Sequence, residues 1–284
     1  MTKKIVAVDS QKLDSMMACT YQFKNKFLDG KEPEEKPDYY ERGGLMHAML
    51  DPYYKIKKYK PRWRQNQKTH MDIVQSCVNI GRHFARNLNI DIAEIEMCVA
   101  AFMQYTDFWE NDSFNDILSV EQVGSKVLYE NPQIMIMYEY KVDLIVKINN
   151  VVTPIDHKSA KSRRDPNYLS NQFRGYCWSL ECNRILVNEI GFQKTLPPKD
   201  KFRRHTLTYS DNLIKEWREE AIYWIMHTVN LVEKGIFPRN TTSCDKFPLC
   251  PFKAEICSSD PDVREFKKDQ FFRNKSWDIG ADYL

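Results

Sequence analysis

The sequence predicts an α/β core that carries a helical lobe. Two observations predict this class. Apolar residues recur at helical spacing over roughly the first 110 residues, and alternating apolar runs follow to about residue 160. A helix, two more strands and a long helix complete the order, which is typical of a sheet covered by helices. We expect one domain over residues 1–284, with the helical lobe at 36–115 and the core at 116–235.

The helices of the N-terminal part are predicted first. Ser10 belongs to a residue type that caps helices, and the helix that it opens should run to about Leu28. Residues 29–38 are charged and contain prolines, which indicates a loop. Helical periodicity then covers three stretches: residues 39–58, 68–88 and 91–111.

The core is predicted from strands that surround one helix. The expected strands are residues 117–129, 133–148, 151–158, 184–192 and 203–209. Between the third and the fourth, Asp165 and Pro166 suit the start of a helix that runs to about Cys182. Asp211 should cap a long helix to about Lys234, and the proline-containing tail from Phe237 should be irregular.

A tight hairpin at Asn149-Asn150 carries the most informative side chains. A two-residue turn at this position places Asp143 opposite Asp156 on the neighbouring strand, and Lys158 shares their face of the sheet. Two carboxylates so close repel each other unless a cation neutralises them, and Mg²⁺ prefers such oxygen ligands. The alternative is a solvated hairpin that carries these three residues by chance.

Composition excludes some classes of protein. The hydrophobic fraction of 42% and the charged fraction of 29% are ordinary for a globular chain, and the net charge is +3. The sequence has no apolar run long enough to span a membrane and no secretory signal, so we expect a cytoplasmic protein, bacterial or viral in a host.

Basic residues gather in two clusters that could follow a phosphate backbone. They are Lys158, Lys161, Arg163 and Arg164, and then Lys199, Lys201, Arg203, Arg204 and His205. A third stretch interleaves lysines and arginines with Tyr53, Tyr54, Tyr59 and Trp63, a pattern that suits stacking on single-stranded nucleic acid. In each case an ordinary solvated face is the alternative.

The eight cysteines divide into two groups. Four of them lie in apolar helical patterns and are expected to be buried and reduced: Cys77, Cys98, Cys177 and Cys182. The others combine one early residue with three that are spaced five and six residues apart in the tail: Cys19, Cys244, Cys250 and Cys257. Four thiolates suit either zinc or a 4Fe–4S cluster, and the alternative is four unrelated buried cysteines.

Several of these residues match motifs in the order found in one family. Asp156-His157-Lys158 matches a D/E-x-K element, and Asp143 matches the aspartate that precedes it. Gln172 and Tyr176 match a Q-x-x-x-Y element, and the segment 43–47 matches G-x-x-x-H, which ends at His47. The chain therefore resembles the RecB-like branch of the PD-(D/E)XK nucleases over residues 43–176. It departs from the pattern at Tyr140, where the family often has glycine.

The resemblance implies a mixed central sheet flanked by helices and a metal-dependent nuclease site. Asp143, Asp156, the backbone carbonyl of His157 and His47 would hold Mg²⁺ or Mn²⁺, and Lys158 would stand beside the attacking water. Gln172 and Tyr176 would orient Lys158 or hold a phosphate. Glu121 is the first candidate for an additional acidic ligand, ahead of Asp51 and Asp116.

The second cysteine group extends the resemblance to iron–sulfur members of the branch. These include AddB nuclease domains, CRISPR-associated RecB-like exonucleases and related phage exonucleases. A 4Fe–4S cluster on these four cysteines would join residues 10–30 to residues 236–260, with zinc as the alternative. The match departs at Thr20, where proline is usual, and in the spacing of the C-terminal cysteines.

The function implied is an exonuclease acting on single-stranded DNA or DNA ends. Two alternatives stay open: a degenerate fold that binds DNA or a partner without cutting, and an endonuclease within a repair, recombination or spacer-capture assembly. Replication, repair or recombination proteins are the expected partners. The chain has no G-x-x-x-x-G-K-[ST] motif, so any motor would be a separate protein.

Overall fold

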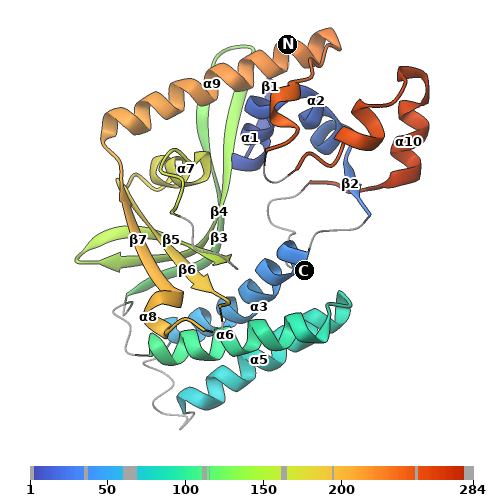
Figure 1. Cartoon of the computed structure of the whole chain (residues 1–284). Coiled ribbons are helices and arrows are strands. Elements are labelled where there is room, and N and C mark those ends of the chain that lie inside the picture. Colours follow the sequence, from blue (N-terminus) through green and yellow to red (C-terminus); the bar gives the residue numbers. More distant parts are fainter. Residues whose placement is uncertain are drawn as a thin grey trace. The chain divides into compact units, whose positions relative to one another are not determined.

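The fold is a mixed sheet flanked by helices (Figure 1). The computed structural model describes residues 3–34, 38–59, 69–110, 114, 116–160, 165–193, 195–246 and 249–277. The chain divides into two compact units. One comprises described residues within 1–36, 125–140 and 211–282, and the other those within 37–124 and 141–210.

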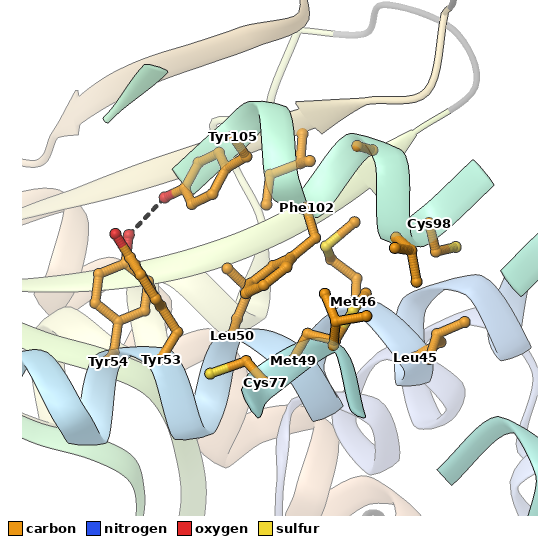
Figure 2. Close-up of a cluster of buried hydrophobic side chains, with 14 of the residues drawn as sticks. Leu45, Met46, Met49, Leu50, Tyr53, Tyr54, Cys77, Cys98, Phe102 and Tyr105 are labelled. Atoms are coloured by element: carbon orange, nitrogen blue, oxygen red, sulfur yellow. Dashed lines mark hydrogen bonds between the residues drawn. The ribbon is translucent and has the colours of Figure 1, made fainter. Parts of the chain in front are cut away.

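The second unit contains the three predicted helices of the lobe. They are α3 (Asp38–Lys58), α5 (His70–Asn87) and α6 (Ile92–Phe108), which confirms three of the sequence predictions. Thr69 and Asp72 form a capping box at the start of α5, and Asp91 caps α6. Apolar side chains of α3, α5 and α6 interdigitate in a buried cluster that Figure 2 shows in part. This cluster also packs against Leu144 and Ile155 of the sheet.

The strands of this unit follow the predicted hairpin closely. They are the second half of β4 (Ile134–Ile148), β5 (Val151–Ala160), β6 (Arg184–Gly191) and β7 (Phe202–Thr208), with the short α8 (Pro198–Lys201) before the last. β4 and β5 are antiparallel with the predicted register, from Ile148 opposite Val151 to Leu144 opposite Ile155. β5 and β6 run parallel, and β6 and β7 antiparallel.

The hairpin turn has the backbone geometry that its sequence predicted. Asn149 and Asn150 have φ angles of 51° and 62°, which lie in the left-handed region that asparagine tolerates better than most residues. This geometry matches the right-handed twist of the two strands, so the register is fixed locally.

The helix after β5 begins later than expected. α7 spans Asn171–Ser179, so the expected start at Asp165 and Pro166 is wrong. The segment before α7 is held by other bonds. The hydroxyl of Tyr168 donates to the Thr208 carbonyl, and Arg174 donates to the Leu169 carbonyl at 2.7 Å. These contacts outweigh the local helix signal.

The first unit contains β1 (Lys4–Val8), a strand that was not predicted. β1 pairs in parallel with the first half of β4, from Lys4 opposite Ile134 to Val8 opposite Tyr138. The predicted helix α9 (Asp211–Lys234) packs its buried Trp217 edge-on against Tyr138, with ring centroids 5.3 Å apart. β3 (Ile117–Glu130), which pairs with β4, is present as predicted.

The expected helix from Ser10 to Leu28 is broken. α1 (Ser10–Ala18) is followed by α2 (Thr20–Phe23) and a π-helical turn, η1 (Lys24–Leu28). Asp9, rather than Ser10, caps α1 by accepting a hydrogen bond from the Lys12 N–H at 2.8 Å. Cys19 lies at the break in an extended conformation, with φ −165°.

The C-terminal tail is more regular than the sequence indicated. It contains the short turns η2 (Thr241–Ser243), η3 (Lys253–Cys257) and η4 (Pro261–Val263). α10 (Arg264–Phe271) and β8 (Phe272–Asn274) follow, and β8 pairs with β2 (Lys31–Pro33). Within the described part of the chain, no helix is long and apolar enough to cross a membrane.

Candidate metal centre and cysteine pocket

Three side chains of the second unit converge on one point. His47 of α3, Glu121 of β3 and Asp143 of β4 each offer a ligand atom, and these atoms lie within 4.8 Å of one another. Nδ1 of His47 is 3.7 Å from Oε1 of Glu121 and 3.8 Å from Oδ1 of Asp143. One imidazole nitrogen and two carboxylates form a donor set that suits a divalent cation.

Glu121 reaches this point through an unusual backbone. Its φ of 51° lies in the left-handed region, which a non-glycine residue within a strand rarely adopts. Such conformations cost about 1 kcal/mol or more and persist where surrounding contacts hold them. The Glu121 carboxylate is held on its other oxygen by the Lys141 ammonium at 3.2 Å. Glu121 therefore lies beside His47 and Asp143, whereas neither Asp51 nor Asp116 belongs to the converging group.

Asp143 joins the two strands at the point where their paired register ends. Its Oδ2 accepts a hydrogen bond from the backbone N–H of His157 at 2.7 Å, next to the last pair, Leu144 and Ile155. Oδ1 is the oxygen that faces His47. The two oxygens of the Asp143 carboxylate thus have different contacts. One is hydrogen-bonded to the His157 N–H and holds the side chain in place, and the other faces His47.

Asp156 is adjacent but is not one of the three converging ligands. It is 1% exposed, and the ammonium of Lys158 lies 3.1 Å from its Oδ1 and 2.9 Å from its Oδ2. The negative charge of Asp156 nonetheless raises the pKa of Asp143. The sequence predicted two facing aspartates that share one cation. In the structure the two side chains are neighbours but have separate partners: the His157 N–H for Asp143 and the Lys158 ammonium for Asp156.

A chain of hydrogen bonds runs from Lys158 into α7. Lys158 donates to Oε1 of Gln172 at 3.1 Å, and Nε2 of Gln172 donates to the hydroxyl of Tyr176 at 2.8 Å. That hydroxyl in turn donates to the backbone carbonyl of Lys141. Gln172 and Tyr176 are one helical turn apart, so both face the same side of α7. The structure thus brings the Q-x-x-x-Y residues to Lys158.

The pKa values of these side chains reflect burial and the opposite charges that lie close together. Burial, reinforced by Asp156 and Glu121 and opposed by His47, raises the pKa of Asp143 to about 7. Burial would lower the pKa of His47, but attraction to Asp143 and Glu121 outweighs it and the pKa is raised. The pKa of Lys158 is raised too, because Asp156 and Asp143 outweigh the effect of burial. The two carboxylates therefore favour a cation at this point, either the imidazolium of His47 or a divalent ion.

A second candidate site lies in the first unit. The four cysteines of the predicted cluster, Cys19, Cys244, Cys250 and Cys257, line one pocket of about 240 Å³. The backbone N–H of Asn240 approaches the sulfur of Cys19 at 3.3 Å. Burial and the charges of the other three cysteines raise the pKa of Cys257 to about 11. Among the described residues, no three of these sulfurs lie within 4.8 Å of one another.

The cysteines expected in the core are placed as predicted, with one partial exception. Cys77, Cys98 and Cys177 are buried, and Cys182 is half-buried.

The basic and aromatic clusters are largely committed to packing. Tyr53 and Tyr54, expected to be exposed, are each 1% exposed in the core of the second unit, whereas Tyr59 is exposed. Lys201 is buried and donates to Gln104 at 2.9 Å. Arg203 pairs with the buried Glu189, and the guanidinium of Arg204 lies between the rings of Trp109 and Phe114. Trp63, Lys161, Arg163 and Arg164 lie outside the described residues.

The comparisons with known proteins concern the fold. A crystal structure from Eubacterium rectale that carries the name "Putative exonuclease" matches with a TM-score of 0.52, at 10% identity over 91% of each chain. A crystal structure of SSO0001 matches with a TM-score of 0.41, at 11% identity over 91% of this chain and 89% of that one. No protein-family model and no curated protein sequence matches the chain. The first of these likenesses supports the α/β fold.

Two polar residues near the site were not predicted. Lys141 lies two residues before Asp143 and holds both Glu121 and the Tyr176 hydroxyl. Asn188 is fully buried on β6 and donates to His157 Nδ1 at 2.7 Å. Asn188 follows the apolar run Ile185-Leu186-Val187 on β6, so a polar residue at the end of that run was a signal in the sequence for a buried polar contact.

Proposed function

We propose that this protein is a divalent-metal-dependent DNA nuclease of the RecB-like PD-(D/E)XK type, acting on single strands or DNA ends. The convergence of His47, Glu121 and Asp143 beside the Asp156–Lys158 pair carries the proposal. A hard divalent ion suits two carboxylates and an imidazole, and the neighbouring carboxylates that raise the pKa of Asp143 and of His47 favour a cation at this point. The likeness in fold to the Eubacterium rectale structure supports the same class.

The residues of the site would have separate roles in binding the metal and the phosphate. His47, Glu121 and Asp143 would hold Mg²⁺ or Mn²⁺, and Asp156 and the carbonyl of His157 would be the further oxygen ligands that the resemblance implies. When bound, such an ion supplies a water of lowered pKa and stabilises charge on the phosphate. Lys158 lies half-exposed at the edge of the group, so its ammonium can donate to a phosphate oxygen. Gln172 and Tyr176 hold that ammonium toward the site.

The test is cleavage of an end-labelled single strand, with and without Mn²⁺. We expect shortening that requires the metal and is lost in Asp156→Ala, while the variant keeps the wild-type melting temperature. Unchanged cleavage by Asp156→Ala would exclude this site. A circular single strand then separates the two modes of attack, because an exonuclease leaves a circle intact.

We further propose that the cysteine pocket holds a 4Fe–4S cluster. Zinc–sulfur bonds of about 2.3 Å in a tetrahedron bring the thiolates to about 3.8 Å from one another. A cluster places iron and sulfide between the thiolates and keeps them farther apart. The pocket of about 240 Å³ that all four cysteines line supports a bound group of this kind. Such a group would fasten the break at Cys19 to the tail beyond Cys244.

A further inference from the structure

Four buried polar side chains form a closed ring of contacts next to the metal centre. They are Tyr54 of α3, Tyr105 of α6, His157 of β5 and Asn188 of β6, and each is at most 4% exposed. Each comes from a different element of the second unit. His157 is also the central residue of the Asp156-His157-Lys158 segment.

Three hydrogen bonds and one stacking contact make up the ring. The amide of Asn188 has two N–H groups, and the structure gives each an acceptor: the Tyr105 hydroxyl at 2.8 Å and Nδ1 of His157 at 2.7 Å. The hydroxyls of Tyr105 and Tyr54 are 2.5 Å apart, the bond drawn in Figure 2. The Tyr54 ring closes the circle by stacking on the His157 imidazole, with centroids 5.3 Å apart and an interplanar angle of 13°.

Burying these four polar side chains costs free energy unless each keeps its partner. Three hydrogen-bonding groups and an imidazole are removed from water here, and each would cost free energy if its partner were lost. Apolar side chains could fill the same volume without the cost of an unpaired polar group. Nδ1 of His157 faces the amide nitrogen of Asn188 at 2.7 Å, and because an amide NH₂ group only donates, this ring nitrogen is the acceptor.

The ring is connected to two of the three metal-ligand candidates. The His157 side chain is fixed by the ring, while its backbone N–H donates to Asp143 at 2.7 Å. Tyr54 lies seven residues after His47 on α3, which is about two helical turns, so both face the sheet from one side of the helix. The centroids of the His47 and His157 imidazole rings are 6.2 Å apart.

We propose that Tyr54, Tyr105 and Asn188 are positioning residues for the metal centre. Acting through His157 they hold the peptide that fixes Asp143, and acting through α3 they set the approach of His47 to the same carboxylate. Groups that orient ligands from behind typically change metal affinity about 10- to 100-fold when removed. This inference rests on the proposed metal-dependent function.

The experiment measures Mn²⁺ affinity directly, by the electron paramagnetic resonance of free Mn²⁺, alongside the melting temperature in EDTA. Tyr105→Phe removes two hydrogen bonds of the ring and should raise the Mn²⁺ dissociation constant about 10-fold. Tyr54→Phe keeps the stacked ring and should give a smaller rise in the same direction. Tyr209→Phe is the matched control, since this buried hydroxyl donates at 2.8 Å to the Tyr168 carbonyl.

The outcomes separate this inference from the proposed function. A purely structural ring would lower the melting temperature of Tyr105→Phe and Tyr209→Phe alike and leave both Mn²⁺ dissociation constants at the wild-type value, which overturns the inference alone. If wild-type protein itself binds no Mn²⁺, the proposed function fails and the inference falls with it. If Tyr105→Phe does not fold, an unchanged dissociation constant in the milder Tyr54→Phe is sufficient to overturn it.

Discussion

The backbone N–H of His157 donates to Oδ2 of Asp143 at 2.7 Å, across the two central strands. This bond lies just beyond the last paired residues of the hairpin, Leu144 and Ile155. It anchors a half-buried carboxylate by one oxygen and leaves the other 3.8 Å from Nδ1 of His47. The geometry of the candidate metal centre therefore depends directly on the register of the hairpin.

Asp143→Asn should separate metal binding from stability. Asparagine can still accept a hydrogen bond from the His157 N–H. The substitution removes a negative charge that burial and two neighbouring carboxylates disfavour. We expect Mn²⁺ affinity to fall at least about 10-fold, as for loss of a ligand. The melting temperature in EDTA should stay the same or rise by a few degrees. A large loss of stability would mean that the charge itself is needed for folding.

Lys158→Ala should remove cleavage without removing the metal. The Lys158 ammonium binds Asp156 and Gln172 and is not one of the converging ligands. We expect the rate of DNA cleavage to fall at least about 100-fold, as for loss of a group that stabilises charge in a reaction. Mn²⁺ binding, followed by the resonance of free Mn²⁺, should be retained. Loss of binding in this variant would instead make Lys158 part of the metal site.

Gln172→Leu should weaken cleavage to an intermediate degree. It removes the acceptor for Lys158 and the donor to Tyr176 while keeping the helix and the bulk of the side chain. We expect roughly a 10-fold fall in rate, which corresponds to about 1.4 kcal/mol in the barrier. The matched control is Gln75→Leu on α5, where the amide bonds only to the exposed neighbouring turn at Asn79. An equal loss in both variants would point to general destabilisation.

The cysteine pocket predicts a coloured protein. Anaerobically purified protein should show a broad visible absorption and contain iron, and substitution of any one of Cys19, Cys244, Cys250 or Cys257 by serine should diminish both. Cys182→Ser is the control, because Cys182 is a half-buried thiol of the other unit. Colourless protein that contains zinc would contradict the iron–sulfur proposal and favour the alternative metal.

Lys268→Met should destabilise the first unit in a pH-dependent way. Lys268 is 1% exposed and donates to Asp29 at 2.7 Å and to Glu265 at 2.8 Å. Removing these bonds to charged groups should cost about 2 kcal/mol in the free energy of unfolding at pH 7. Lys267→Met is the control, since its exposed pair with Glu255 at 3.6 Å is worth at most about 1 kcal/mol.

The pH range of that effect follows from the pKa shifts. Burial would raise the pKa of Asp29, but Lys24 and Lys268 outweigh it and the pKa is lowered. A lowered carboxyl pKa gives stability that is present above about pH 4 and is lost as the pH falls further. The difference between wild type and Lys268→Met in urea denaturation should therefore shrink below that pH. A constant difference from pH 7 to pH 2.5 would contradict this account.

What the sequence could predict was set by local rules. The hairpin register followed from Asn149-Asn150, and the lobe helices followed from apolar spacing. The burial of Tyr53 and Tyr54 was predictable too, because they lie four residues after the apolar Met49 and Leu50 on the same faces of α3. The adjacent lysines gave the same segment the pattern of a charged, solvated face.

The remainder depended on contacts between distant segments. α7 starts at Asn171 because Tyr168 is held by the strand at Thr208, forty residues away in sequence. No local pattern marks such a bond. The left-handed φ of Glu121 and the ring around His157 likewise arise only when several elements pack together. Sequence motifs therefore indicated the candidate ligands, whereas the residues that contact them from behind became visible only in the folded protein.

The most direct test of the central claim compares wild type with Asp143→Asn on an end-labelled single strand of DNA. The account predicts that wild type shortens the strand with Mn²⁺ and not in EDTA, and that the folded variant leaves it intact at the same Mn²⁺ concentration. Metal-independent shortening, or equal shortening by both proteins, would contradict a metal centre built on His47, Glu121 and Asp143.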